Sequence, residues 1–284
     1  MNMKGLGAVV VTGASKGIGR ACALHLDRLG FQVFAGVRRD EDGQALRREA
    51  SDRLVPVLLD VTDAASIEDA EGRVAEAVGA TGLAGLVNNA GVAVAGPLEF
   101  LPLSELRRQL EVNVIGQIAV TQAMLPHLRR SRGRVVNIGS ISGKSSLPFT
   151  GAYGASKHAL AALTDALRVE LMPWGIEVSI VEPGVIATPI WQTSIRAAEA
   201  VMQDYPPEAH EYYGAAIEKV RAGVAANGET GRPPEDVARV VAHALTARRP
   251  RTRYLVGRDA KVRLLLEKLP DRLRDRLIAS RLWR

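Results

Sequence analysis

The sequence predicts an α/β protein built on a single doubly wound parallel sheet of about seven strands flanked by helices. Two observations support this fold class. Short apolar runs alternate along the chain with segments of helical periodicity. The runs are apolar at nearly every position, which is typical of parallel strands covered by helices on both faces. With 284 residues, 47% of them apolar, the chain can bury a substantial core.

The expected strands and helices follow one another in alternation. Strands are expected at residues 9–11, 33–37, 55–59, 86–87, 135–138, 178–181 and 254–256. Helices are expected at residues 18–29, 64–78, 103–128, 152–171 and 234–246. Residues 189–232 form a far longer connection than usual and are expected to be a helical lid over a substrate site. Because no repeat or linker divides the chain, we expect one domain over residues 1–257 and a C-terminal extension over residues 258–284.

Composition excludes several classes of protein. The single cysteine, Cys22, cannot form an internal disulfide, and the five histidines show no metal-ligand spacing, so we expect a reducing compartment and no metal site. No stretch reaches the roughly 18 uninterrupted apolar residues of a membrane span. The first apolar run ends at Thr12-Gly13 without the cleavage site of a signal peptide. We therefore expect a cytoplasmic protein.

The first turn between a strand and a helix carries three glycines. Gly13, Gly17 and Gly19 follow the strand at residues 9–11 and open the next helix. Glycines in this context let the backbone approach a pyrophosphate at the helix N-terminus. Because glycines also serve ordinary tight turns, the turn alone does not establish a dinucleotide site.

The spacing T-G-x-x-x-G-x-G of this turn resembles the short-chain dehydrogenase/reductase family, and further motifs of that family follow in order. They are Asn88-Asn89-Ala90-Gly91, Asn113, Ser140, Tyr153-Gly154-Ala155-Ser156-Lys157, and Pro183-Gly184 with Thr188. Independent accidents would rarely arrange so many motifs in this order. The resemblance covers residues 5–257 and implies a Rossmann-type fold and a nicotinamide cofactor. Within this family, the chain is most similar in overall pattern to members that act on steroids, retinoids or similar lipids.

Four of these residues form a candidate catalytic set. Tyr153 and Lys157 are four residues apart on an expected helix, so their side chains share one face. An adjacent ammonium and a positive nicotinamide ring favour the phenolate of Tyr153, which makes Tyr153 the expected general acid/base. Ser140 is expected to hold the substrate oxygen. The resemblance implies that Lys157 also binds the nicotinamide ribose and that Asn113 fixes a water molecule in a proton relay.

Each of the four also has a structural explanation when taken singly. Tyr153 fits a surface tyrosine, Lys157 a solvated helix charge and Ser140 a turn residue at a strand end. Asn113 fits a core amide whose hydrogen bonds are satisfied. The combination favours catalysis over these explanations.

The end of the second expected strand indicates the form of the cofactor. An acidic residue there would bind the ribose 2′-hydroxyl of NAD(H) and repel a 2′-phosphate. The sequence instead has Arg38 and Arg39, with Lys16 in the glycine turn, so we expect NADP(H) rather than NAD(H). In the alternative, the acidic residues 40–42 form a solvated loop and neutralise the two arginines. The other expected cofactor contacts are Ser15, Ile18, Asp60, Val61, Asn89, Ala90, Gly91, Pro183, Gly184 and Thr188. Asp60 could instead cap the helix at residues 64–78, although Thr62 and Asp63 are better placed.

The expected substrate site is apolar. Around Ser140 and Tyr153, the candidate wall residues are Leu147, Phe149, Ile190, Trp191, Tyr205, Tyr212 and Tyr213. In the alternative, these side chains only pack the lid on the body. Because no basic clamp for a small acid is apparent apart from Arg196, we expect a hydrophobic alcohol or carbonyl compound, with a 3-oxoacyl thioester as the alternative.

The C-terminal extension is basic. Residues 251–284 contain eleven basic and four acidic side chains. Residues 261–284 combine this charge with an apolar stripe interrupted at Pro270. Two interpretations stay open: the stripe packs on the protein or a sister subunit, or it makes a peripheral contact with an anionic membrane. We expect no nucleic-acid binding, because no recognised module accompanies the charge.

A second class of function competes with the enzyme. A non-catalytic cofactor-sensing or membrane-adaptor protein could use the same fold. The complete set of Ser140, Tyr153 and Lys157 argues against this alternative. The family resemblance also implies a homodimer or homotetramer, paired through the helices that begin near Leu103 and Ala152.

Overall fold

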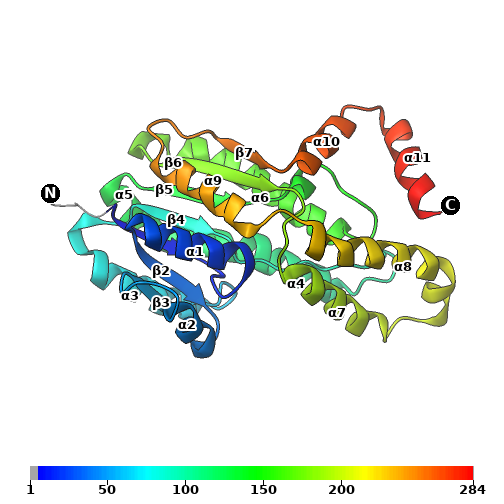
Figure 1. Cartoon of the computed structure of the whole chain (residues 1–284), viewed down its shortest axis with the longest axis horizontal. Helices are drawn as coiled ribbons and strands as arrows, with labels where there is room; N and C mark the ends of the chain where they lie inside the picture. The colour runs from blue at the N-terminus through cyan, green and yellow to red at the C-terminus, as the bar shows by residue number, and fades with distance from the viewer. Residues whose placement is uncertain (1–5, 284) are drawn as a thin grey trace.

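The computed structural model describes residues 6–283, with the side chains of residues 227–229 outside the description. Its seven parallel strands form one sheet in the order β3-β2-β1-β4-β5-β6-β7, with helices on both faces (Figure 1). The strands are β1 (Ala8–Val11), β2 (Gln32–Val37), β3 (Leu54–Leu58), β4 (Gly85–Asn88), β5 (Arg134–Ile138), β6 (Glu177–Pro183) and β7 (Arg253–Val256). The predicted doubly wound α/β fold is confirmed. The strand order reverses between β1 and β4, which is where ligands bind in such sheets.

The helices occupy most of the remaining chain. They are α1 (Gly17–Leu29), α2 (Asp40–Arg47), α3 (Ala64–Val78), α4 (Leu103–Leu110), α5 (Gly116–Ser131), α6 (Gly151–Glu170), α7 (Ile190–Met202), α8 (Pro207–Thr230), α9 (Pro234–Thr246), α10 (Arg258–Leu266) and α11 (Asp271–Leu282). Short helical turns are η1 (Gly79–Thr81), η2 (Glu111–Ile115), η3 (Ile141–Gly143) and η4 (Met172–Trp174). Figure 1 shows α7, α8, α10 and α11 at one end of the molecule. None of the described helices has the length and apolar composition needed to cross a bilayer.

Strand β1 shows why the expected strands are apolar throughout. Val9 and Val11 pack into the cluster beneath α1 and α9, together with Leu26. Val10 faces the opposite side of the sheet and packs with Val74 of α3. All three valines are fully buried, because helices cover both faces of this central strand.

Two expectations about local structure were wrong. The single helix expected over residues 103–128 is divided into α4, the π-helical turn η2 and α5. The side chain of Asn113 in this turn bonds to both backbone groups of Val92, and these contacts account for the local break. In addition, the acidic residues 40–42 begin helix α2 and are not a loop.

The C-terminal extension forms two helices that separate at Pro270, as the sequence suggested. Helix α10 contacts β7 and η3, and α11 contacts α8. The extension is therefore attached both to the sheet and to the lid helices.

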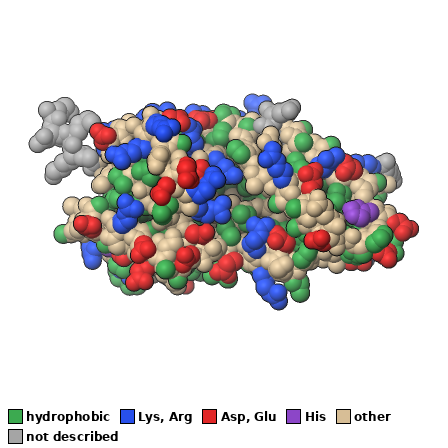
Figure 2. Space-filling model, turned by 90° about the horizontal axis from the view of Figure 1, so that it is seen from below, with side chains coloured by type: hydrophobic (Ala, Val, Ile, Leu, Met, Phe, Trp, Pro, Cys, Tyr) green, Lys and Arg blue, Asp and Glu red, His purple; other side chains and the backbone are tan. Residues whose placement is uncertain are grey.

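Basic and acidic side chains are interspersed over the face of the molecule drawn in Figure 2.

Candidate active site

The glycine turn has the backbone geometry that an anion site requires. Gly13 and Gly17 adopt left-handed conformations, with φ of 64° and 57°. The first turn of α1 follows, and it has neither a side-chain cap at Lys16 nor an acidic residue. Its N–H groups are therefore free of side-chain competition, which suits a phosphate at the helix N-terminus.

The Asn88–Gly91 segment holds this turn in place. The backbone N–H groups of Asn89 and Ala90 each donate to Thr12 Oγ1 over 2.9 Å. Asn89 Nδ2 in turn donates to the carbonyls of Thr12 at 2.9 Å and Gly13 at 3.1 Å. A Cβ added at Gly13 would lie 2.9 Å from the Cα of Ala90, so only glycine fits this approach. The expected cofactor residues of β1 and β4 thus form one unit.

Asn113 is fully buried, and its amide is satisfied by protein groups. Its Oδ1 accepts from Val92 N–H, and its Nδ2 donates to the Val92 carbonyl, both over 2.9 Å. Nδ2 also lies 3.2 Å from Ser156 Oγ. These contacts give Asn113 a structural role, and its expected role in a proton relay stays a prediction.

Ser140, Tyr153 and Lys157 come together at the carboxyl end of β5. Ser140 directly follows Gly139 after this strand, and its Oγ accepts from the N–H of Ser142 at 3.1 Å. Tyr153 lies in the first turn of α6. Lys157 Nζ lies 5.8 Å from the centroid of the Tyr153 ring and donates to the carbonyl of Ile138 over 2.8 Å.

The electrostatics of this group are governed by burial. Burial raises the pKa of Tyr153, while hydrogen bonding with Ser140 and the positive charge of Arg263 act in the opposite direction. Burial lowers the pKa of Lys157 to about 8. The sequence predicted Lys157 as the cation beside Tyr153. It did not predict Arg263, which comes from the C-terminal extension.

The segment after β6 brings a second set of expected cofactor residues to the glycine turn. The side chain of Thr188 packs against Gly17, where an added Cβ would lie 3.2 Å from Thr188 Cβ. Pro183 ends β6, and the next residues are held by Asp259, whose Oδ2 accepts from the N–H of Val185 over 2.6 Å. The turns after β1 and β6 therefore lie side by side.

The two arginines after β2 have different surroundings. Arg39 donates from Nε and Nη2 to the carboxylate of Asp42, both over 3.0 Å, as the alternative interpretation expected. Arg38 is exposed and forms no ion pair in the part of the chain that the structure describes. Arg38 is therefore the freer of the two to meet a phosphate. Lys16 lies toward the lid instead, with its Nζ 3.4 Å from Thr193 Oγ1 in α7.

The residues after β3 are also accounted for. Asp60 Oδ1 accepts from the N–H and the hydroxyl of Thr62, at 2.9 and 2.7 Å. Asp63, and not Asp60, caps α3 by accepting from the N–H of Ala65. Asp60 is thus not the helix cap. Val61 is buried beside it in the core.

The lid is joined to the body by aromatic side chains. Tyr213 of α8 lies at the centre of an aromatic cluster. Its ring centroid is 6.0 Å from that of Phe100, 5.9 Å from that of Phe149 and 6.2 Å from that of Trp283. Tyr205 joins the cluster through Phe100, at 6.1 Å. Phe149 is buried in a left-handed conformation with φ of 63°. Such backbone strain is concentrated at functional sites.

The other expected wall residues are less enclosed. Leu147 is 40% exposed and Tyr212 56% exposed. Ile190 and Trp191 begin α7, and Trp191 Nε1 donates to the Ile186 carbonyl over 2.6 Å, which anchors the lid. Phe100 and Trp283 were not predicted to lie at this site, because both reach the cluster from distant segments of the chain.

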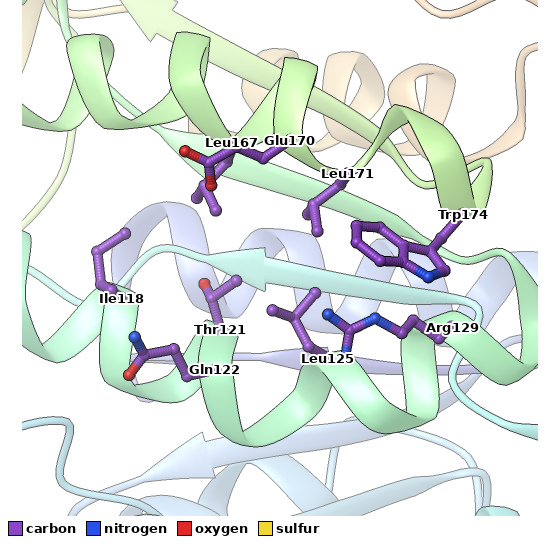
Figure 3. A pocket seen from close by; sticks show the side chains of 9 residues that line it. All are labelled: Ile118, Thr121, Gln122, Leu125, Arg129, Leu167, Glu170, Leu171 and Trp174. Atoms are coloured by element: carbon purple, nitrogen blue, oxygen red, sulfur yellow. The ribbon is translucent and has the colours of Figure 1, made fainter.

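A groove of about 440 Å³ lies away from these residues, between α5 and α6 (Figure 3). It is lined by Ile118, Thr121, Gln122, Leu125, Arg129, Leu167, Glu170, Leu171 and Trp174. The guanidinium of Arg129 stacks over Trp174 at 4.8 Å from the ring centroid. The groove faces the C-terminal half of α6, whereas Tyr153 and Lys157 lie in its N-terminal half, so this groove is not the catalytic site.

The doubly wound sheet, the glycine turn and the Ser-Tyr-Lys group define the class of Rossmann-type oxidoreductases. The family model of short chain dehydrogenase matches residues 7–199, and the chain belongs to this family. As an oxidoreductase of this family, it acts on alcohol or carbonyl groups.

Relatives extend the similarity along the whole chain. Retinol dehydrogenase 5 of Mus musculus is 40% identical over 283 residues, covering 95% of this chain and 87% of the relative. NADPH-dependent 3-dehydrocapnine reductase of Ornithobacterium rhinotracheale is 35% identical and covers 94% of both chains. Among solved structures, a short chain dehydrogenase from Burkholderia cenocepacia in complex with NADP has a TM-score of 0.72 at 26% identity and covers 100% of both chains.

Proposed function

We propose that this chain is an NADP(H)-dependent enzyme that interconverts a hydrophobic alcohol and its ketone or aldehyde. The observation that carries the proposal is the convergence of Ser140, Tyr153 and Lys157 at the carboxyl end of β5. The similarity to a retinol dehydrogenase supports the substrate class. The glycine turn beside this group supports a dinucleotide.

A nicotinamide cofactor, when bound, would supply or accept the hydride at the substrate carbon. During reduction, the hydroxyl of Tyr153 donates its proton to the carbonyl oxygen, and during oxidation its phenolate takes the proton from the alcohol. Ser140 Oγ donates a hydrogen bond to the same substrate oxygen and stabilises the negative charge that develops there. Lys157 is held by Ile138, and its remaining N–H groups are available to the ribose of the cofactor.

The cofactor is held by two neighbouring groups of residues. The turns after β1, β3 and β4 supply Gly13, Ser15, Gly17, Ile18, Gly19, Asp60, Val61, Asn89, Ala90 and Gly91. The turn after β6 supplies Pro183, Gly184 and Thr188. Arg38 binds the 2′-phosphate of NADP(H), because Arg39 is already paired with Asp42 and Lys16 lies against the lid. The NADPH-dependent relative and the solved complex with NADP support this preference.

Residues 1–257 form the catalytic domain, and residues 189–232 within it form the lid that selects the substrate. The aromatic cluster around Tyr213 joins Phe149, which lies four residues before Tyr153, to the lid helix α8. Apolar side chains at this junction favour an extended hydrophobic substrate over a small charged one. Asn113 fixes the water that returns protons to Lys157.

The protein pairs with a second copy of itself through the face formed by α5 and α6. This face carries the groove of Figure 3, and Trp174, which lines the groove, is 45% exposed. Arg129 and Glu170 line the same groove, so a twofold arrangement can bring opposite charges together. Molar mass measured by light scattering tests this: the wild type gives a dimer or tetramer, and Trp174→Glu shifts it toward monomer.

The C-terminal extension makes a peripheral contact with an anionic membrane in the cytoplasm. Val262 and Leu265 of α10 are 57% and 63% exposed, and Leu273 and Leu277 of α11 are each 47% exposed. They stand among the basic residues of a segment with eleven basic and four acidic side chains. Co-sedimentation with phosphatidylserine vesicles tests the contact, which Leu265→Glu should weaken.

The experiment that tests the enzymatic proposal is a measurement of cofactor consumption. NADPH and NADH are compared with retinoid, steroid and short-chain carbonyl compounds, with Tyr153→Phe as the control. Tyr153-dependent oxidation of NADPH by a bulky apolar carbonyl supports the proposal. Turnover that persists in Tyr153→Phe contradicts the assigned mechanism.

A further inference from the structure

Helix α10 turns two of its charged side chains, Asp259 and Arg263, toward the body of the protein, whereas Arg258 and Lys261 are exposed. Asp259 and Arg263, one helical turn apart, contact two loops that carry candidate active-site residues. Val262 and Leu265 of the same helix are exposed. A surface helix ordinarily has the reverse arrangement, with apolar residues inward and charged residues outward. The inward polar face of α10 therefore needs an explanation beyond the packing of a core.

Asp259 fixes the turn that follows β6. Its Oδ2 accepts from the N–H of Val185 over 2.6 Å. The carboxylate lies so close to Gly184 that an added Cβ would stand 2.0 Å from Oδ2. This part of α10 is thus tied to the turn after β6, which is proposed to bind the cofactor.

Arg263 reaches the loop between Ser140 and Tyr153. Its Nη2 donates to the backbone carbonyl of Ser145, and α10 contacts η3, the turn that follows Ser140. Its Nε is buried and has no hydrogen-bond partner. A guanidinium stays protonated in proteins, so a permanent positive charge is enclosed beside the catalytic group.

The charge of Arg263 acts on Tyr153. The positive charge opposes the effect of burial on the Tyr153 pKa, and the same interaction favours the charged form of Arg263. Asp259 of α10 and Glu267, which directly follows this helix, are acidic groups that act on Arg263, and Lys157 is a second cation near Tyr153. The interaction therefore joins a residue of the C-terminal extension to the general acid/base.

We propose that Arg263 is a positioning residue of the active site: from the C-terminal extension, it holds the Ser145 loop and presents a permanent positive charge toward Tyr153. This proposal rests on the proposed function, because it concerns the residue that moves the proton. In the direction of alcohol oxidation, the charge stabilises the phenolate that accepts the proton. The extension is then part of the catalytic unit and not only an attachment segment.

The first test uses the full-length protein and needs no substrate. The ultraviolet absorbance of tyrosinate is followed against pH, and the signal of Tyr153 is assigned from its loss in Tyr153→Phe. Arg263→Gln removes the charge but keeps an N–H donor for Ser145, whereas Arg263→Lys keeps the charge. Lys261→Gln is the matched control, since Lys261 is an exposed cation on the same helix.

We expect Arg263→Gln to raise the midpoint of the Tyr153 titration by about one pH unit, which is the lower end of the effect of a neighbouring opposite charge. Arg263→Lys and Lys261→Gln should leave the midpoint close to that of the wild type. An unchanged midpoint in a folded Arg263→Gln protein, as judged by circular dichroism, overturns the proposal. If Arg263→Gln does not fold, Arg263→Lys tests the proposal instead, because it keeps the positive charge. A Tyr153 titration midpoint that is raised by about one pH unit in Arg263→Lys contradicts a role for the charge.

The second test is the pH dependence of kcat/KM for oxidation of an apolar alcohol. The limb that rises with pH should move to higher pH in Arg263→Gln, with about a tenfold loss below the midpoint, since one pKa unit changes the phenolate fraction tenfold. An equal loss at every pH indicates a purely structural role and contradicts the proposal. Absence of turnover in the wild type counts against the proposed function alone, because the tyrosinate titration still decides the role of Arg263.

Discussion

Lys157 Nζ donates a hydrogen bond of 2.8 Å to the carbonyl of Ile138, which joins helix α6 to the last residue of β5. Lys157 is only 5% exposed, and burial lowers its pKa from 10.5 to about 8. Folding therefore disfavours the charged ammonium. At about 1.4 kcal/mol for each pKa unit, the burial of this charge costs roughly 3 kcal/mol. The buried charge of Lys157 therefore destabilises the folded protein, at a position where catalysis needs this residue.

Lys157→Met should make the cofactor-free protein more stable and inactive. The variant removes the burial cost of the charge and loses one charge-assisted hydrogen bond worth about 2 kcal/mol, so we expect a net gain of about 1 kcal/mol. The free energy of unfolding in urea at neutral pH measures this gain. Lys261→Met, at an exposed position, should leave stability and activity unchanged.

The stability difference should depend on pH. Below pH 8, Lys157 is charged in the folded and unfolded protein, so the full cost of burial is present. As pH rises from about 8 toward 10.5, the folded protein releases this proton first, and the cost declines. The difference in the free energy of unfolding between Lys157→Met and the wild type should therefore decrease with rising pH. A gap that is constant or widens would contradict the burial of a charged Lys157.

Tyr153→Phe should separate cofactor binding from turnover. The substitution removes only the hydroxyl that moves the proton, and general acid/base catalysis typically contributes about 10²–10⁴-fold, so kcat should fall by about 10³-fold. The dissociation constant of NADPH, measured by fluorescence, should change by less than about threefold, since the proposed phosphate contacts are untouched. Ser140→Ala should lower kcat by about 10²-fold, because it removes one donor to the substrate oxygen.

Arg38→Gln should weaken selectivity for NADP(H), whereas Arg39→Gln should not. Arg38 has no ion pair among the described residues, but Arg39 is committed to Asp42. Loss of a charge-assisted contact with the 2′-phosphate should raise KM for NADPH about tenfold and leave KM for NADH unchanged. Equal effects of the two variants, or a parallel change for NADH, would contradict the role of Arg38.

Local rules predicted the parts of the site that lie within single motifs. The glycine turn and the pair of Tyr153 and Lys157 were predictable, because their geometry follows from spacing on one turn or one helix face. The strands were predictable because sheets buried on both faces need apolar side chains at every position. The exact division of the helix around Asn113 was not predictable, since it depends on hydrogen bonds to Val92 in a distant loop.

The contributions of the C-terminal extension could not be predicted from its pattern. Asp259 and Arg263 are ordinary charged residues in a basic segment, and only the folded chain places them against Val185 and Ser145. Trp283 reaches Tyr213 in the same way. In each case the two partners are separated by more than 60 residues, so neither spacing nor periodicity carries the information.

Gly184→Ala should reveal how tightly the extension is joined to the site. The new Cβ would stand 2.0 Å from Asp259 Oδ2, so the carboxylate must move and its bond to Val185 must break. Overpacking of this kind costs about 1–3 kcal/mol, and we expect a loss of about 2 kcal/mol in urea unfolding.

The double variant Gly184→Ala with Asp259→Gly decides whether this contact is the cause. Removing the carboxylate opens space for the added methyl group, so the two losses should be less than additive by about 1 kcal/mol. Full additivity would place the strain of Gly184→Ala elsewhere in the turn. The coupling between the two substitutions and a higher KM for NADPH in Gly184→Ala would together show that helix α10 positions the turn after β6. Helix α10 would then position this turn as well as the loop between Ser140 and Tyr153.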